Sequence, residues 1–314
     1  MLLAIRHRTE LGYDAPISET AMELRMTPET TARQVLRGFG IAVAPPATLH
    51  EHVDWSGNRV HSFSIAEAHD RVVILAHSAV ETRPAPDPFE AAPGPGPEAG
   101  DPRLLDYLRF EGPVTADRRI EEIARQLGLA GCATHAEVGS RICHGLRGRL
   151  EYRRGVTTSL ATVSDALERG AGVCQDFAHL AIALLRHTGV PARYVSGYLY
   201  RPGAEEVETH AWVEAHLPGR GWSGFDPTHA EVVGLGHVAV ATGRSYADVP
   251  PNRGVYRGAA TETIRVVVRI DEVVEVPRGL LAPAAAGLDV ATLALTAADH
   301  RERLDYQQQE QQQQ

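Results

Sequence analysis

The sequence has few cysteines, no long apolar run and no excess of positive charge. Its three cysteines, Cys132, Cys143 and Cys174, are too few and too odd in number to build a disulfide scaffold. No stretch of about 18 apolar residues occurs, which argues against a membrane-spanning helix. The formal net charge is -9, which disfavours general binding to a phosphate backbone. We therefore expect a globular chain with reduced thiols and with neither a nucleic-acid nor a membrane partner.

Three further patterns are missing. The opening "MLLAIRHRTELGYDAPIS" has no basic segment followed by an apolar run, so it does not resemble a secretory signal. Together with the sparse cysteines, this favours the cytoplasm. The sequence also has no EF-hand loop pattern, and the spacings among Cys174, His210 and Asp226 lack the paired pattern of structural zinc. We expect no cofactor and no metal.

What the sequence does contain is arranged in four parts. Residues 1–82 are β-rich, with strands around polar turns, and predict a small β-sandwich. Residues 83–103 are dense in proline and glycine and predict a linker. Residues 104–276 mix helical and strand patterns and predict a second domain. Residues 277–314 end in "QQQEQQQQ", a low-complexity tail that we expect to be partly disordered.

The second domain reads as α+β. Two segments, "DRRIEEIARQLGL" and "HAEVGSRICHGLRGRLEY", place their apolar residues at helical spacing. Three later segments, "ARYVSGYLY", "THAWVEAHL" and "GWSGFDPTH", read as strands, and the turn "PGRG" predicts a hairpin between the last two. A further strand is predicted from residue 261, in "TETIRVVVRIDEVVEV". Helices packed on an antiparallel sheet are the expected architecture.

The segment "AGVCQDFAHLAIALLRHTG" predicts a helix of about four turns that starts at Cys174 and stops at Gly189. A thiol at a helix N-terminus meets unpaired N–H groups and the positive end of the dipole, which favour thiolate. The same N–H groups can face an oxyanion. Gly170 and Gly172 would permit close approach of a substrate. The alternative is a small core residue at a helix start, because cysteine is often simply buried.

A thiol nucleophile needs a base, and the base needs a group that orients it. His210 lies in "THAWVEAHL", and Asp226 ends the following strand, so a hairpin could bring the two together. His229, three residues after Asp226, is a rival base. The pattern offers no such partner to His7, His61, His69, His77, His187 or His237.

Three separated motifs, "GVCQDFAHL", "THAWVEAHLPGRGWSGFDPTH" and "GRSYADVPPNRGVYRG", resemble the bacterial transglutaminase-like family of candidate cysteine proteases. The resemblance covers residues 104–270, and "IRHRTELGYDAPISETAMELRMTP" resembles the N-terminal domain found with this core. It implies a papain-like core with a Cys-His-Asp triad in that chain order. Carried over by position, Cys174 is the nucleophile, His210 the base and Asp226 the orienting acid.

Other residues near these motifs have open roles. Tyr152 is a candidate second oxyanion donor, because a tyrosine hydroxyl can donate; packing is the alternative. Asp176 is read as a first-turn dipole partner or a loop anchor, and His179 as packing or polar support. Tyr246 and Asp248 are candidates to line the cleft.

The leading hypothesis is thiol-dependent acyl transfer on a peptide or carboxamide, with a peptide or protein as substrate. Water as the acceptor gives a cysteine protease or amidase, which we favour; a lysine amine gives a cross-linking transglutaminase. One alternative is a binding module that keeps the fold without catalysis. Another is a metal site made of Cys174, His210 and Asp226. No oligomeric state is predicted.

Overall fold

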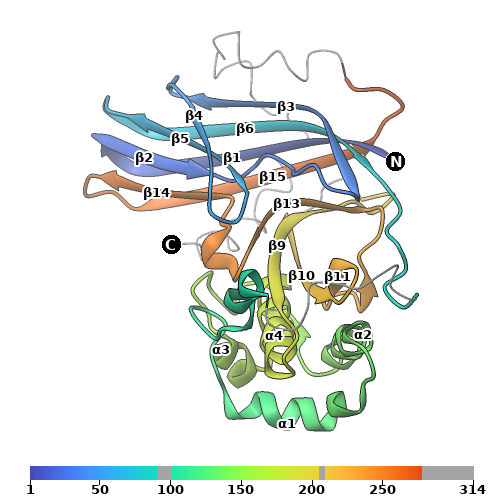
Figure 1. The fold of residues 1–314 in the computed structure, drawn as a ribbon. Helices are drawn as coiled ribbons and strands as arrows, with labels where there is room; N and C mark the ends of the chain where they lie inside the picture. Colours follow the sequence, from blue (N-terminus) through green and yellow to red (C-terminus); the bar gives the residue numbers. More distant parts are fainter. Residues whose placement is uncertain (91–100, 205–208, 278–314) are drawn as a thin grey trace.

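The computed structural model describes residues 1–90, 101–204 and 209–277. About half of the predicted linker, residues 91–100, and nearly all of the predicted tail, residues 278–314, lie outside the described residues. A β-sandwich forms one half of the molecule, and four α-helices with a five-stranded sheet form the other (Figure 1). The predicted α+β architecture with a β-rich N-terminal region is confirmed.

The sandwich consists of two four-stranded antiparallel sheets, in the orders β15-β1-β6-β3 and β14-β2-β5-β4. Alternating apolar residues of both sheets, among them Leu11, Leu24, Phe63 and Ile74, point inward and form its core. Its strands are β1 (Leu2–Ile17), β2 (Glu19–Leu24), β3 (Gln34–Ala44), β4 (His50–Val53), β5 (Arg59–Ile65), β6 (His69–Thr82), β14 (Asn252–Arg257) and β15 (Glu262–Glu272).

Two strands of the sandwich come from the far end of the chain. β15 pairs with β1, with Ile270 opposite Ile5, and β14 pairs with β2, with Val255 opposite Ala21. The sequence analysis grouped both segments with residues 104–276, because strand patterns indicate a strand but not its neighbour. In the structure they are the edge strands of the two sandwich sheets.

The other half wraps its helices around one buried helix, α4 (Cys174–His187), which packs on β10 and β9. The remaining helices are α1 (Arg118–Gln126), α2 (His135–Leu146) and α3 (Val163–Arg169). The sheet has the order β12-β11-β10-β9-β13, with β9 (Ala192–Leu199), β10 (Thr209–Leu217), β11 (Gly221–Asp226), β12 (Glu231–Val232) and β13 (His237–Gly243). Short elements are η1 (Pro102–Leu108), η2 (Leu129–Gly131), η3 (Tyr246–Asp248), β7 (Glu151–Tyr152) and β8 (Ala171–Gly172).

Local sequence explains why these helices begin where they do. Thr134 accepts a hydrogen bond at the start of α2, and Thr162 and Asp165 form a capping box at the start of α3. The predicted helices α1, α2 and α4 are confirmed, as is the hairpin of β10 and β11 around the "PGRG" turn. The short helix α3 and strand β13 were not predicted.

An apolar cluster and buried amides join the two halves. Val238 and Val240 of β13 pack against β1, β6 and β15 of the sandwich. The Asn58 amide exchanges hydrogen bonds with the backbone of Thr242, at 2.9 and 2.7 Å. The halves therefore share a packed and hydrogen-bonded contact.

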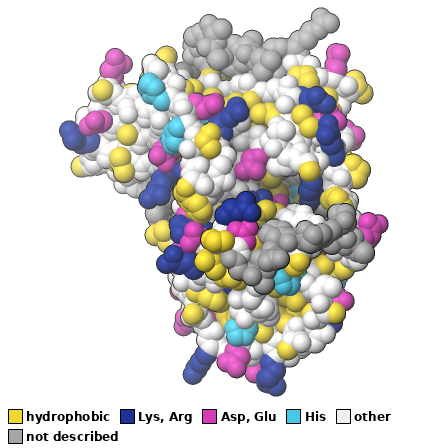
Figure 2. Space-filling model, in the orientation of Figure 1, with side chains coloured by type: hydrophobic (Ala, Val, Ile, Leu, Met, Phe, Trp, Pro, Cys, Tyr) yellow, Lys and Arg dark blue, Asp and Glu magenta, His cyan; other side chains and the backbone are white. Residues whose placement is uncertain are grey.

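The outer surface is mixed in charge. On the face in Figure 2, basic and acidic side chains are interspersed rather than gathered by sign. Within the described ranges, no helix has both the length and the apolar character needed to cross a membrane.

Candidate active site

The first turn of α4 is held by Asp176, whose side chain folds back onto the preceding loop. Its Oδ2 accepts hydrogen bonds from the Val173 N–H, at 2.8 Å, and from the Thr157 hydroxyl, at 2.7 Å. A Cβ at Gly172 would lie 2.6 Å from this carboxylate, so glycine is needed there. Burial raises the pKa of Asp176, while these hydrogen bonds oppose the rise. Asp176 is thus a loop anchor, and it fixes Cys174 as the first residue of the helix.

Tyr152 lies beside the same loop. β7 and β8 pair in parallel, with Tyr152 opposite Gly172, two residues before Cys174. The Tyr152 ring lies 6.4 Å from the Phe177 ring, centroid to centroid, and its side chain is partly exposed. Its role as an oxyanion donor stays a prediction.

His210 and Asp226 are brought together by the β10–β11 hairpin. Nε2 of His210 lies 2.7 Å from Oδ2 of Asp226, and both residues are buried. The Cys174 thiol lies within interaction range of the same imidazole. Burial acts to lower the pKa of His210, but the interactions with Asp226 and Cys174 outweigh burial and raise that pKa to about 10. The Trp212 ring stacks on the imidazole, with an interplanar angle of 30°.

Asp226 accepts hydrogen bonds from three imidazoles. His229 reaches its Oδ2 through Nδ1, at 2.8 Å, and His237 through Nε2, at 3.2 Å. Its Oδ1 accepts from the backbone N–H groups of Thr228 and His229. Burial acts to raise the pKa of Asp226, and the three imidazole bonds overcome it and hold that pKa far below its usual range. The carboxylate is therefore ionised across the ordinary pH range.

His237 was not recognised from the sequence, where it had no expected partner. Its Nδ1 accepts a hydrogen bond from the Gly234 N–H, at 3.2 Å, so Nε2 carries the proton that goes to Asp226. Burial lowers the pKa of His237 and favours this neutral form. The period-2 spacing of Val238 and Val240 is a strand signal, but it does not reveal that β13 lies beside β9.

The remaining residues considered in the sequence analysis lie outside the cluster of His210 and Asp226. His179 is polar support: its Nε2 accepts from the Tyr246 N–H at 3.1 Å, and burial lowers its pKa to about 3. Tyr246 lines a cavity that is also lined by strands of the sandwich, whereas Asp248 forms an ion pair with Arg244. The four histidines at positions 7, 61, 69 and 77 lie in the sandwich strands.

Two overlapping sets of side chains could offer donor atoms to a metal. They are His210, Asp226 and His229, and Asp226, Glu231 and His237, each with its donor atoms within 4.8 Å of one another. Asp226 lies 2.7 Å from His210 and 2.8 Å from His229, and these are the distances of N–H···O hydrogen bonds. Cys174 belongs to neither set, so the metal site considered from the sequence is not among the groups found in the described residues.

The model of the transglutaminase-like superfamily matches residues 122–227, and that of the bacterial transglutaminase-like N-terminal region matches residues 3–81. An uncharacterised protein of Mycobacterium bovis is 33% identical over 301 residues, covering 85% of this chain and 91% of that protein. This chain belongs to the transglutaminase-like superfamily. The resemblance drawn from the three motifs is confirmed.

Two further relatives extend the comparison. A protein-glutamine gamma-glutamyltransferase of Pseudomonas aeruginosa is 33% identical over 173 residues, which is 50% of this chain and 26% of that protein. The crystal structure of a candidate cysteine protease from Cytophaga hutchinsonii has a TM-score of 0.67 and 23% identity, covering 88% of this chain and 93% of that chain. At 23% identity, the second likeness concerns the fold alone.

Proposed function

We propose that the chain catalyses thiol-dependent acyl transfer from a peptide or carboxamide, with Cys174 as nucleophile, His210 as base and Asp226 as orienting acid. The observation that carries this proposal is the position of the His210 imidazole, which hydrogen-bonds to Asp226 and lies within interaction range of the Cys174 thiol. Because Nε2 is taken by the carboxylate, Nδ1 is the nitrogen left for the thiol.

In the first step the Cys174 thiol gives its proton to His210 and the sulfur attacks the carbonyl carbon. The oxyanion that forms accepts hydrogen bonds from backbone N–H groups at the start of α4. The carbon–nitrogen bond then breaks. The amine leaves with the proton that His210 carried, and a thioester remains on Cys174. Asp226 stabilises the imidazolium throughout because it stays ionised.

In the second step an acceptor loses its proton to His210 and attacks the thioester, the carbon–sulfur bond breaks, and the sulfur takes the proton back from His210, which restores the thiol. Water as the acceptor makes the chain a cysteine protease or amidase, the outcome we favour. Transfer to an amine is the second candidate, because the similar protein of Pseudomonas aeruginosa is named a protein-glutamine gamma-glutamyltransferase. We propose a peptide or protein as the substrate and, from the sequence, the cytoplasm as the location.

The first test replaces the nucleophile. Cys174→Ala is expected to remain folded and to lose on the order of 10⁶ in kcat, because a triad acts as a unit. Cys132→Ala is the matched control, since Cys132 is a partly exposed free thiol in a loop. Turnover is measured on a panel of peptides and amides, with mass spectrometry of products and of Cys174 adducts. Near wild-type turnover by a folded Cys174→Ala chain would refute the proposal.

The same panel decides between water and amine. The chain contains no lysine, so it offers no lysine side chain as an acceptor, and any incorporated amine comes from the assay mixture. A glutamine peptide is incubated with and without an added alkylamine. Cleaved or deamidated peptide alone supports hydrolysis, whereas a peptide that carries the alkylamine supports transamidation.

A further inference from the structure

Strand β14 leaves one of its edges unpaired. Among the described strands it pairs with β2 alone, with Arg253 opposite Glu23. The Arg25 N–H donates to the Pro251 carbonyl in the same register, so residues 251, 253 and 255 direct their backbone groups toward β2. The N–H and C=O groups of residues 252, 254 and 256 therefore face the other way. No described residue bonds to these groups, so the edge can accept another strand.

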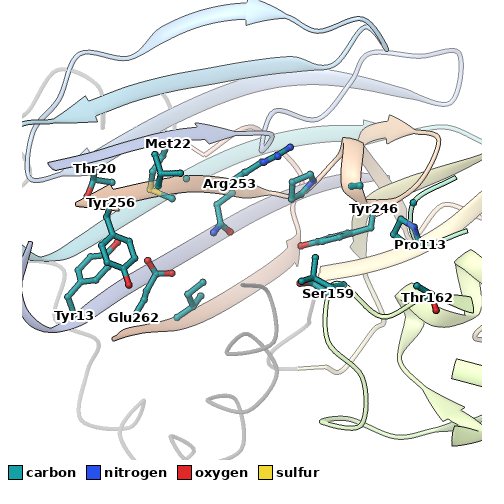
Figure 3. Close-up of a pocket in the computed structure, with 18 residues that line it drawn as sticks. Tyr13, Thr20, Met22, Pro113, Ser159, Thr162, Tyr246, Arg253, Tyr256 and Glu262 are labelled. Carbon is teal, nitrogen blue, oxygen red and sulfur yellow. The ribbon is translucent and has the colours of Figure 1, made fainter. Parts of the chain in front are cut away.

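A cavity of about 680 Å³ borders this edge and extends between the sandwich and the catalytic half. Its volume falls in the range of ligand sites. Figure 3 shows the order of its lining, with Arg253 between two ends. The sandwich end carries Tyr13, Tyr256 and Glu262, and the catalytic end carries Ser159, Tyr246 and Pro113.

The catalytic end of the cavity is attached to the helix that carries the thiol. The Ser159 carbonyl accepts a hydrogen bond from the side chain of Gln175, at 3.0 Å, and Gln175 follows Cys174 directly. The Tyr246 N–H donates to His179, one turn further along α4. Both cavity residues are thus hydrogen-bonded to the first half of α4, the helix that begins at Cys174.

The exposed side chains of β14 indicate which kind of ligand would bind at this edge. Val255 is 72% exposed, which is unusual for a valine on a strand. Arg253 has no ion-pair partner among the described residues. Both also line a second cavity, of about 680 Å³, on the outer side of the sheet. A strand added to β14 would place alternate side chains toward each cavity, and the Arg253 guanidinium would attract a carboxylate.

We propose that an extended acidic peptide adds to the free edge of β14 as a fifth strand of that sheet. It places a carboxylate at Arg253 and delivers its acyl group to Cys174 through the cavity. Main-chain hydrogen bonds provide affinity, and the two cavities select alternate side chains. This inference rests on the proposed function, and it names the substrate class as extended peptides rather than small amides.

The first experiment reads binding without turnover. A capped peptide of about eight residues, alternating threonine and valine with one central glutamate and one glutamine, is added to the Cys174→Ala chain. Hydrogen exchange is measured at single amides. We expect peptide-dependent protection at residues 252, 254 and 256, whereas 253 and 255 are already protected by β2. Peptide-dependent protection that is confined to other segments overturns the inference. Protection that appears without peptide and grows with protein concentration also overturns it, because it would indicate self-association at this edge.

The second experiment uses two arginines of the same strand. Arg253→Glu is expected to weaken binding of the glutamate peptide about tenfold and to raise its KM by the same factor. Arg257→Glu is the control, because Arg257 pairs with Glu19 and lines neither cavity. Equal effects of the two substitutions overturn the inference. If no substrate is turned over, the binding measurements still decide this point, so the two proposals fail separately.

Discussion

At the scale of single residues, Asp226 is distinguished by the number of hydrogen bonds that its carboxylate accepts. Orienting His210 requires one carboxylate oxygen, yet the same Oδ2 also accepts from His229 and His237. A buried carboxylate with this many donors resists protonation. His237, with its tautomer set by Gly234, also keeps the carboxylate from rotating. We therefore regard His237 as a positioning residue, acting through Asp226 on His210.

Asp226→Asn is the substitution that tests this cluster. We expect kcat to fall by on the order of 10³–10⁴, because the amide favours the wrong tautomer of His210. The pKa of His210 should fall, since the carboxylate that raises it is gone. Alkylation of Cys174 near neutral pH should slow as the partner imidazolium is lost. The measurements are steady-state kinetics, NMR titration of the His210 ring and the alkylation rate.

The control is His229→Ala, the rival base, whose side chain is 39% exposed at the rim of the cluster. It should keep most of the activity, whereas His210→Ala should not. Should His229→Ala prove the more damaging of the two, the base has been assigned to the wrong histidine.

The raised pKa of His210 makes the stability of the fold depend on pH. The ordinary histidine pKa is 6.5 and that of folded His210 is about 10. Its contribution to folding is therefore fully present below about pH 6.5 and is lost as the pH rises through about 10. Urea titration should show this decline in the free energy of unfolding, and His210→Gln should reduce it. His144→Gln, at an exposed position on α2, should leave the decline unchanged.

At the scale of elements, the loop before α4 depends on one buried carboxylate. Asp176→Ala leaves the Val173 N–H and the Thr157 hydroxyl without their partner, at a cost of about 1–3 kcal/mol for each buried group. We expect the melting temperature to fall by several degrees, and kcat to fall because Cys174 loses its fixed place. Thr157→Val removes one bond and should cost less. Equal melting temperatures for wild type and Asp176→Ala would contradict the anchor role.

Elements with a local signal in the sequence were predictable. The helix from Cys174 has an apolar face and a Gly189 stop. The β10–β11 hairpin has a glycine turn, and this hairpin places His210 beside Asp226. Non-local pairing was not predictable. His237 reaches Asp226 because β13 lies beside β9, and β14 reaches β2 across most of the chain. A strand pattern specifies which face is buried but not which strand lies next to it.

At the scale of the whole molecule, the sandwich is closed by its two C-terminal strands, β14 and β15. Residues 1–82 alone would lose an edge strand from each sheet, and with it the cover over inward residues such as Leu11 and Met22. The apolar cluster around Val238 and Val240 adds a second tie between the halves. The sandwich and the catalytic half are therefore expected to fold as one unit and to stay together even when the chain that connects them is cut.

A single cut in the predicted linker tests this expectation. Residues 83–103 are rich in proline and glycine, so limited proteolysis should cut there first. The two pieces should then elute together in gel filtration under native conditions and keep the activity of the intact chain, because β14 and β15 remain paired with β2 and β1. They should separate only in denaturant. The comparison is a chain ending at residue 251, which lacks both strands and should be poorly soluble with a lower melting temperature. If the cut pieces separate in native buffer, or if the shortened chain melts like the full one, the C-terminal strands do not hold the sandwich together.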